Sequence, residues 1–502
     1  MPFPEAFKAM KIKNTDGMIN YLKFTAPFFA IIFLAGLGLF ISHSTPAAGQ
    51  NSDEPVRVFS SFWGGSLFEC NHFDRCVSTI DSAGNIYIAG TTESDDFPLI
   101  NQFSDTFSPN SFDDLIVTKI DGETKQVIFS TYLGSGQARA IALDSASNVV
   151  VAGSTGDTNF PVTDNAVQST FNSGVSDGVV VKLSSDGSQL LYSSFLGGSG
   201  DDELIDVAVD SADSIYVTGW TNSQNYPVTF NPAQASFGGD QDMVVTKILA
   251  TGGLFYSTYL GGDRRDRGVG LAVNGSGALT VVGSSGSDGF PTTAGVLQPT
   301  RNSNAGFDAT ITKLNPSGEI QQSTFYGTGS LNDGVAIDVD DEGNSYVLTS
   351  NDGVIKVNPT LSQILYRNVF EITVGNTTGN LRAAGGQGGI DVDSEGIAFV
   401  TGWAGQTTDK DVVLAAISSG GQLIHYETVG GSDEDRGYSI DIVETEGGKK
   451  TAYIVGRTES ADFPTLNPIQ QNLAGGSDVL LIEITNLENI GPELIYLPLV
   501  IR

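Results

Sequence analysis

The sequence predicts an all-β protein, a seven-bladed β-propeller with four antiparallel strands in each blade, and three observations lead to this fold class. A unit with four short apolar runs recurs along the 502-residue chain. A turn of similar sequence marks seven copies of that unit. The segment 56–62 matches the fourth strand of a unit, whereas the seventh copy has no clear fourth strand.

The clearest copy of the unit covers residues 192–253. Its four apolar runs are residues 205–209, 215–219, 243–248 and 254–260. They are rich in Val, Ile and Tyr, which favour the packed surface of a strand. Asp and Ser at 210–214 and glycines at 252–253 favour a tight turn within each pair of runs. The unit is therefore predicted to be two hairpins in one sheet.

The copies are counted from the turn that follows the first strand. Successive turns begin 63, 66, 64, 66, 53 and 51 residues apart, at Asp81, Asp144, Asp210, Asn274, Asp340, Asp393 and Glu444. One four-stranded sheet buries too little surface to be stable alone, so such repeats must stack. Seven units of this kind predict a radial propeller. An open solenoid is the alternative, but it normally uses shorter repeats and needs capping ends.

Several motifs of the unit resemble a known repeat. They are Tyr-Ser-Thr-Tyr-Leu-Gly-Gly at 256–262, Asp-Ser-Ala-Gly-Asn-Ile-Tyr-Ile-Ala-Gly-Thr-Thr at 81–92, Asp-Phe-Pro at 96–98 and Asp-x-x-Val-x-Lys at 114–119. Over about residues 56–484 the chain resembles the bacterial seven-bladed β-propeller repeat family, called the SBBP repeat. The resemblance implies this fold and export from the cytoplasm. It implies no reaction, because the family has no common assigned one.

Residues 1–49 lie outside the repeat and are predicted to be a secretory signal. The segment 24–41 is apolar except for Thr25, follows Lys23 and ends near the small residues 46–49. A basic flank, an apolar stretch and a small-residue end are typical of such signals. An uncleaved membrane anchor is the alternative, since about 18 apolar residues approach the length of a membrane span. In both cases the remainder is expected outside the cytoplasm, secreted or attached to the cell envelope.

The remaining domain boundaries follow from the repeat. Residues 50–55 form a linker, 56–485 form the propeller and 486–502 form a C-terminal tail. Residues 56–62 are expected to pair beside residues 479–484 as the missing fourth strand of blade seven, because an unpaired sheet edge invites aggregation. The tail ends in Tyr-Leu-Pro-Leu-Val-Ile-Arg, and its role is not inferred.

Charge and cysteine content narrow the function classes. The chain has 25 basic and 58 acidic residues, a net charge of −33. Nucleic acids and anionic membrane surfaces both require a basic face, so neither is an expected partner. The membrane is expected to contact the protein only through residues 24–41. Cys70 and Cys76 are predicted to form a disulfide, as an exported pair usually does. Zinc bound with His72, or two free thiols, are the alternatives.

Acidic loops gather on the propeller face that carries the connections from strand two to strand three. Carboxylates suit calcium, so calcium is considered as a cofactor, with Asp201, Asp202, Asp433 and Asp435 as candidate ligands. The spacing of a twelve-residue calcium loop is absent. The alternative is that each aspartate caps a neighbouring loop or pairs with an arginine.

Trp220 and Trp403 occupy equivalent positions after the glycine near the end of strand two, and both are candidate ligand-binding residues. An aromatic ring on this face suits stacking on a sugar or a peptide side chain. Blades five and six lack the long insert between strands two and three, having only residues 350–353 and 404–410 there. We therefore expect the face to be most open at this notch, with Trp403 exposed on its rim. Burial of either indole is the alternative.

The inserts of the other five blades each carry an aromatic residue followed by proline. These pairs are interpreted as packing groups, and one helical turn is expected at 164–168. No catalytic residue is assigned, since the sequence has neither a Gly-x-Ser-x-Gly nor a His-Glu-x-x-His motif. The predicted function is a non-catalytic binding or scaffold module whose partner is a protein or a glycan. A polysaccharide-active hydrolase or lyase on the same face is the alternative.

Overall fold

The computed structural model describes residues 12–13, 19–20, 54–71, 75–108, 113–302, 306–328, 332–369, 371–374, 377–380, 388–406 and 409–490. The chain divides into two compact units, Met1–Ser52 and Asp53–Arg502. In the first, β1 (Ile12–Lys13) pairs antiparallel with β2 (Ile19–Asn20). The predicted signal at 24–41 and most of the predicted tail lie outside the described residues.

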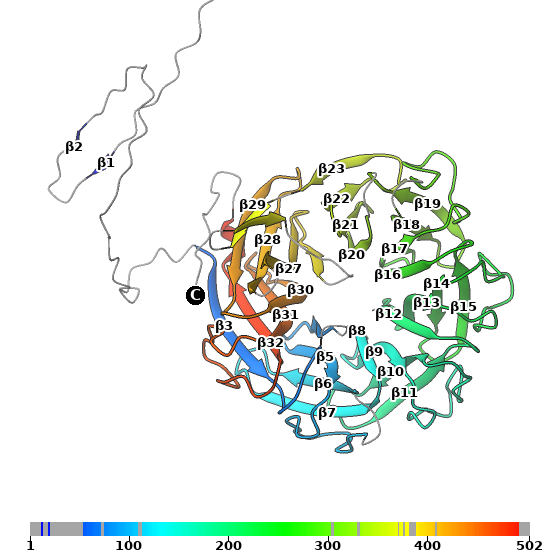
Figure 1. Ribbon diagram of the computed structural model, residues 1–502, viewed down its shortest axis with the longest axis horizontal. Coiled ribbons are helices and arrows are strands. Elements are labelled where there is room, and N and C mark those ends of the chain that lie inside the picture. The colour runs from blue at the N-terminus through cyan, green and yellow to red at the C-terminus, as the bar shows by residue number, and fades with distance from the viewer. Residues whose placement is uncertain are drawn as a thin grey trace, which may run out of the picture. The chain divides into compact units, whose positions relative to one another are not determined.

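The second unit is a ring of seven four-stranded antiparallel sheets, which confirms the predicted fold class (Figure 1). Blade one consists of β4 (Val77–Ile80), β5 (Ile86–Thr92), β6 (Asp114–Ile120) and β7 (Val127–Ser135), and blade two of β8 (Gln137–Leu143), β9 (Val149–Thr155), β10 (Asp177–Leu183) and β11 (Leu190–Leu196). Blade three consists of β12 (Asp202–Val209), β13 (Ile215–Thr221), β14 (Asp242–Ile248) and β15 (Leu254–Leu260). Blade four consists of β16 (Asp266–Val273), β17 (Leu279–Ser285), β18 (Asp308–Leu314) and β19 (Ile320–Tyr326).

Blades five to seven complete the ring. They consist of β20 (Gly334–Val339), β21 (Ser345–Thr349), β22 (Gly353–Val357) and β23 (Ile364–Asn368); β26 (Gly389–Val392), β27 (Ala398–Gln406), β28 (Asp409–Ile417) and β29 (Leu423–Val429); β30 (Asp435–Glu444), β31 (Lys450–Thr458) and β32 (Asp478–Thr485), joined by β3 (Val56–Trp63). In each blade the first strand lies nearest the centre of the ring (Figure 1).

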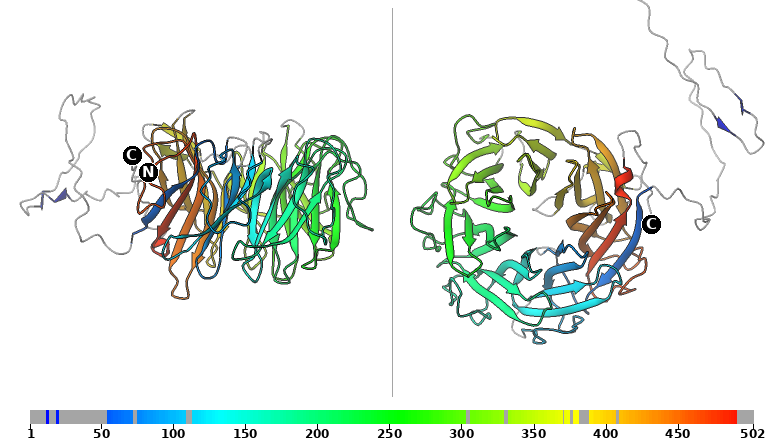
Figure 2. Two further views of the ribbon diagram at one scale, coloured as in Figure 1. Left: turned by 90° about the horizontal axis from the view of Figure 1, so that it is seen from below. Right: turned by 180° about the vertical axis from the view of Figure 1, so that it is seen from behind.

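The N-terminal strand closes the ring as predicted. β3 pairs antiparallel with β32, with Phe62 opposite Leu480. The two strands, blue and red, lie side by side at the outer edge in both face-on views (Figures 1 and 2). Phe62 is buried in one cluster with Val412 of blade six and Ile454 of blade seven. The closing strand therefore completes a sheet and also contributes to the apolar layer between two blades.

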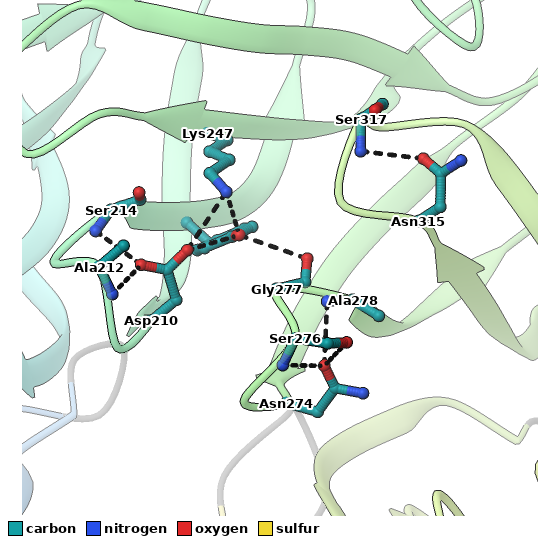
Figure 3. Close-up of polar contacts among 11 residues, drawn as sticks. Asp210, Ala212, Ser214, Lys247, Asn274, Ser276, Gly277, Ala278, Asn315 and Ser317 are labelled. Carbon is teal, nitrogen blue, oxygen red and sulfur yellow. Dashed lines mark hydrogen bonds and ion pairs between the residues drawn. The ribbon is translucent and has the colours of Figure 1, made fainter.

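Turns of similar sequence link strands one and two, and Figure 3 shows those that begin at Asp210 and Asn274. Asp210 Oδ1 accepts hydrogen bonds from the N–H groups of Ala212 and Ser214, 2.9 Å each. Its Oδ2 accepts the Tyr216 hydroxyl at 2.9 Å and the Lys247 ammonium at 3.2 Å. Burial opposes the charge of Asp210, but these donors together hold its pKa below the ordinary value. The aspartate therefore fixes the turn and anchors it to strands two and three.

The aromatic residue of each insert is a packing group, as interpreted from the sequence. Tyr226 is 2% exposed and its ring lies 6.2 Å from that of Tyr259 on β15. The equivalents Phe97, Phe160, Phe290 and Phe463 are buried in the same way. The helical turn expected at 164–168 is wrong: the segment forms one reverse turn, closed by Ala166 N–H donating to the Thr163 carbonyl. Side-chain bonds to the outer strand take the place of helical ones there.

The inner strands are tied to one another by aspartates. Asp338 accepts the Val392 N–H at 2.8 Å, from blade five to blade six. Asp391 accepts the Ile442 N–H at 2.6 Å, from blade six to blade seven. Asp206 and Asp441 make similar bonds to Leu271 N–H and to the Ser78 hydroxyl. Each bond joins neighbouring blades at the centre of the ring, where the sheets themselves share no ladder.

Blades five and six have the short connections that were expected, since β22 begins four residues after β21 ends. An element that was not expected lies between these blades. β24 (Glu371–Val374) and β25 (Thr377–Asn380) form a hairpin whose strands lie beside β27. The expectation that the face is most open here stays a prediction.

Replacing Phe62 with alanine tests how much the closing strand contributes. Phe62 is 1% exposed and its ring lies 6.1 Å from that of Phe463, edge to face. Phe62→Ala should lower the free energy of unfolding by about 3–5 kcal/mol, as large-to-small core substitutions do. Phe230→Ala is the control, because Phe230 is 93% exposed and should change stability by less than about 0.5 kcal/mol. Denaturant titration measures both, and equally small changes would contradict this account of closure.

A reciprocal exchange tests the turn. Asp210→Asn should cost about 1–3 kcal/mol, because Tyr216 and Lys247 lose a charged acceptor. Blade four already has asparagine there: Asn274 Oδ1 accepts only local donors such as Ser276 and Ala278 N–H, 3.0 Å each. Burial lowers the pKa of nearby Lys313 to about 8. Asn274→Asp should raise that pKa, measured by NMR titration; an unchanged value would show that the two side chains do not interact.

Candidate functional site

The loop-rich face, defined as the face that carries the connections from strand two to strand three, is organised by a repeated polar junction between blades. Between blades three and four, Gln234 Nε2 donates to Asp242 Oδ2 at 3.1 Å, and Gln234 Oε1 accepts the Gly261 N–H at 3.0 Å. A Cβ on Gly261 would lie 2.5 Å from Asp242 Cγ, so this position requires glycine. The same pairs recur as Gln168 with Asp177, Gln298 with Asp308 and Gln470 with Asp478.

The next blade contributes a second carboxylate to each junction. Asp266 Oδ2 accepts the Gly262 N–H and the Ser287 hydroxyl, 2.7 Å each. A Cβ on Gly262 would lie 2.7 Å from Ser287 Cβ. Asp202 and Asp435 make the same two kinds of bond at their junctions. The Gly-Gly motif therefore admits the carboxylates of both blades.

The two carboxylates of a junction are buried close together. Asp242 and Asp266 are fully buried, and Oδ1 of each has no hydrogen-bond partner among the described residues. Burial, and then the charge of Asp266, raises the pKa of Asp242 to about 7. Burial likewise raises the pKa of Glu69 and Asp435 to about 7, and of Asp177, Asp202 and Asp478 to about 6. These groups therefore change between the neutral and the charged form at a pH of about 6 to 7.

The candidate calcium ligands divide between two separate junctions. Asp202 and Asp435 are buried structural groups, at the junctions of blades two and three and of blades six and seven. Asp201 caps a neighbouring loop, since its Oδ1 accepts the Val175 N–H at 2.7 Å. Asp433 is exposed. Within the described ranges, no three or more His, Cys, Asp or Glu residues are grouped so that they could hold a metal ion. Calcium binding stays a prediction, which a melting curve with and without a chelator tests.

Cys70 and Cys76 are disulfide-bonded, as predicted, with Cα atoms 5.5 Å apart. Both are fully buried beside blade one. A Cβ on Gly90 would lie 2.5 Å from Cys76 Sγ, so the bridge packs directly on β5. This pairing favours the disulfide over zinc binding through both thiolates and over two free thiols. His72 lies outside the described residues.

The exposure expected for Trp403 is wrong. Its side chain is 8% exposed and lies under two cations: Lys410 Nζ is 5.0 Å and Arg436 Cζ 5.5 Å from the ring centroid. Both cations pair with Glu434. The short connection of blade six does not uncover the ring, because charged side chains of blades six and seven cover it. Whether Trp403 contacts a ligand is untested.

Trp220, at the equivalent position of blade three, borders a cavity of about 370 Å³. The indole is half-buried, and its Nε1 donates to Glu203 Oε2 at 3.0 Å. Arg267 Cζ lies 5.4 Å from the ring centroid. β-bulges in β12 and β16 accompany Ile205 and Val269 on the wall of the cavity. The cavity therefore opens at the inner strands, on the loop-rich face.

The charged lining of this cavity comes from blades one to five. Four arginines and two carboxylates contribute, namely Arg75, Arg139, Arg265, Arg267, Glu203 and Asp333. Arg139 Nε lies 2.5 Å from Glu203 Oε1. A second, narrower cavity of about 190 Å³ shares Arg75 and Arg139 and is lined by inner strands from Val77 to Ile440. The arginines therefore stand where the two cavities meet.

A third hollow, of about 770 Å³, lies between blades one and two and is more open than the arginine-lined cavity. Loop segments such as 106–108 and 154–157 line it, with few large side chains. Gly136, directly before β8, stands in blade two where blades three and four have Asp202 and Asp266. We favour the cavity beside Trp220 as the site, because aromatic and charged groups converge there.

Sequence reasoning found Trp220 but missed its neighbours. Glu203, Arg267 and Asp333 each follow the junction residue that begins their blade, and alignment of the units would have placed them at one level of the ring. Arg75 and Arg139 do not obey that alignment. They reach the cavity through the irregular start of β4 and the bulge of β8, which only the structure shows.

Comparison with known proteins identifies the family of the repeat. Residues 79–98 and 192–227 match the family model described as "SBBP: Beta-propeller repeat". The chain carries the SBBP β-propeller repeat. No curated protein matches the chain. Among solved structures it is similar to the Cps50 (Swd1) β-propeller domain of Myceliophteria thermophila, with 8% identity, a TM-score of 0.44 and coverage of 85% of this chain and 99% of that one.

A second similar structure is BamB from Moraxella catarrhalis, with 11% identity, a TM-score of 0.39 and the same coverage of both chains. The matched SBBP segments include the turn at Asp81, the turn at Asp210 and the insert aromatics Phe97 and Tyr226. The repeat is therefore recognised by its turns and packing groups. Across the described part of the chain, no helix has the length and apolar character needed to cross a membrane.

The junction carboxylates predict how stability depends on pH. Their pKa values are about 6 to 7 in the folded protein, above the ordinary values of 3.8 and 4.5. The folded state therefore binds these protons more tightly than the unfolded chain does. The resulting stability is present at low pH and is lost as the pH rises through 6 to 7. The melting temperature should be higher at pH 5 than at pH 8.

Asp242→Asn should reduce this dependence. An amide in that place is neutral and has a donor that can reach the Asp266 carboxylate, so stability at pH 8 should rise by on the order of 1 kcal/mol. Asp263→Asn is the control, because Asp263 is an exposed group of the same loop and the charge change is identical. Calorimetry at both pH values measures the effect. A destabilised Asp242→Asn at pH 8 would contradict the account of the junction.

Proposed function

We propose that this protein is an exported, non-catalytic binding module that takes a ligand into the cavity beside Trp220. The observation that carries this proposal is the convergence of an indole, arginines and carboxylates from five blades around about 370 Å³. Such concave sites with a few placed polar groups are typical of small-ligand binding. The volume suits one sugar unit of a glycan or one side chain of a partner protein.

Three features support export to the cell envelope or beyond. Residues 24–41 have the composition of a secretory signal or an anchor. The Cys70–Cys76 disulfide suits an oxidising compartment. The net charge of −33 keeps an extracellular ring soluble. Fusion of residues 1–55 to a reporter, followed by fractionation, tests export and shows whether the segment is cleaved or retained in the membrane.

The enzyme alternative rests on Glu203 and Asp333, two carboxylates in one cavity, as glycosidases require. Both oxygens of Glu203 are already engaged, Oε1 by Arg139 at 2.5 Å and Oε2 by Trp220 at 3.0 Å. A carboxylate held in this way is poorly placed to transfer a proton to a substrate. The geometry therefore favours binding of a ligand over its cleavage by hydrolysis or elimination.

A glycan and peptide array, followed by a turnover assay on each hit, tests the proposed function. The expected result is binding without product. Trp220→Ala should weaken that binding by about 2 kcal/mol, as an anchoring aromatic does. Trp403→Ala is the control: it removes the equivalent, buried indole at another junction, and should lower the melting temperature without changing affinity. Product formation would support the enzyme alternative, and unchanged affinity in Trp220→Ala would move the site elsewhere.

A further inference from the structure

The cavity beside Trp220 is positively charged in a protein that is otherwise strongly acidic. Four arginines line it against two carboxylates, whereas the whole chain has 25 basic and 58 acidic residues. One of the four, Arg265, pairs with Asp240, which is not part of the lining. Arginines placed together on the wall of a narrow cavity repel one another unless an anion lies between them. The charge of the lining residues therefore favours a ligand that carries a negative charge.

Among the four arginines, Arg75 is the one whose positive charge is least compensated by nearby carboxylates. It belongs to the wall of both connected cavities, and it forms no hydrogen bond or ion pair with any residue that the structure describes. Burial, and then the charge of Arg139, lowers its pKa to about 10. Asp206 and Glu203 offset this only in part. Its guanidinium therefore has unused donors in a place with restricted access to water.

Arg267 contributes a second guanidinium to the lining of the cavity. One donor, Nε, is used by Gln241 Oε1, and the guanidinium lies 5.4 Å from the indole centroid. Arg267 is an exposed residue that lines the cavity, and partial loss of water contact lowers its pKa, which Glu203 and Asp333 counter. A guanidinium stacked on an aromatic ring is fixed in orientation, so its remaining donors suit a planar carboxylate. Arg139, in contrast, is occupied by Glu203.

The other lining groups suit a sugar ring. Trp220 and the half-buried Phe307 supply aromatic surface. The carboxyl of Asp333 and the hydroxyl of Ser284 belong to the same lining and can bond sugar hydroxyls. Because the rest of the protein is acidic, a densely charged polyanion is repelled before it reaches the cavity. A ligand with one isolated carboxylate is not.

On the basis of the proposed function, we propose that the cavity recognises a saccharide with an isolated carboxylate, a uronic acid unit, through Arg75 and Arg267. The carboxylate lies between the two guanidinium groups, and the sugar ring lies against Trp220. A peptide with a free carboxylate and an uncharged sugar are the competing ligands, and the experiment separates them.

The test titrates the full-length protein with methyl glucuronide, its methyl ester and methyl glucoside, followed by calorimetry and ligand-observed NMR. The glucuronide should bind at least about tenfold more tightly than the ester and the glucoside. Raising NaCl from about 50 to about 500 mM should weaken only the glucuronide. Arg75→Gln and Arg267→Gln should each abolish most of this preference, with little effect on the glucoside.

Arg264→Gln is the matched control, because Arg264 is an exposed arginine of the same loop that does not line the cavity. It should bind all three compounds as the unchanged protein does. Arg75→Gln should also leave the melting temperature unchanged, since Arg75 has no partner to lose among the described residues. If Arg267→Gln is unstable, the affinities of Arg75→Gln alone test the proposed recognition of the carboxylate. Trp220→Ala should weaken the glucuronide and the glucoside alike.

Each remaining outcome contradicts a different claim. Equal affinity for the acid and its ester overturns the proposed carboxylate recognition but leaves the proposed function intact. Binding of an acidic peptide on the array, together with no binding of the glucuronide in the titration, overturns the sugar assignment. If none of the three compounds binds, the inference is wrong, and the proposed function then depends on the array. If the array also yields nothing, both are wrong.

Discussion

The arrangement of the ring depends on a polar junction that recurs between neighbouring blades. Gln234 holds the insert of blade three against Asp242 and Gly261, and Asp266 of blade four bonds the next glycine of the same turn. One network thus fixes the insert, the outer strand and the following inner strand together. Since sheets in a propeller share no ladder across blades, these bonds set the angle at which one sheet packs on the next.

This arrangement accounts for much of the acidity of the chain. Pairs of buried carboxylates stand at the junctions, and further aspartates such as Asp338 and Asp391 accept N–H groups of the neighbouring inner strand. Each accepts hydrogen bonds in a place where a neutral acceptor would also fit, so the charge is a cost near neutral pH. Asn332, which replaces the aspartate at the start of blade five, shows that the junction tolerates a neutral group.

The candidate site arises where the blades differ. In blades three and six the same tryptophan position is covered by an arginine of the next blade, at 5.4 and 5.5 Å. In blade six Lys410 and Glu434 complete the cover, so the indole is closed off. In blade three no equivalent lysine lies over the described ring, and the indole borders a cavity. Small departures from the repeat therefore decide which junction is structural and which can receive a ligand.

The sequence by itself determined the seven blades, the closing strand, the disulfide and the role of the insert aromatics, because each depends on local turn chemistry, periodic apolar runs or redox context. It also placed Trp220 on the loop-rich face. Only the tertiary structure decided that Trp403 is buried, that Asp202 and Asp435 belong to the junctions, and that Arg75 and Arg139 meet Arg267. These outcomes depend on which side chains occupy the same space in the folded ring. The three arginines, for example, are 64 to more than 190 positions apart in the chain, and no local pattern relates them.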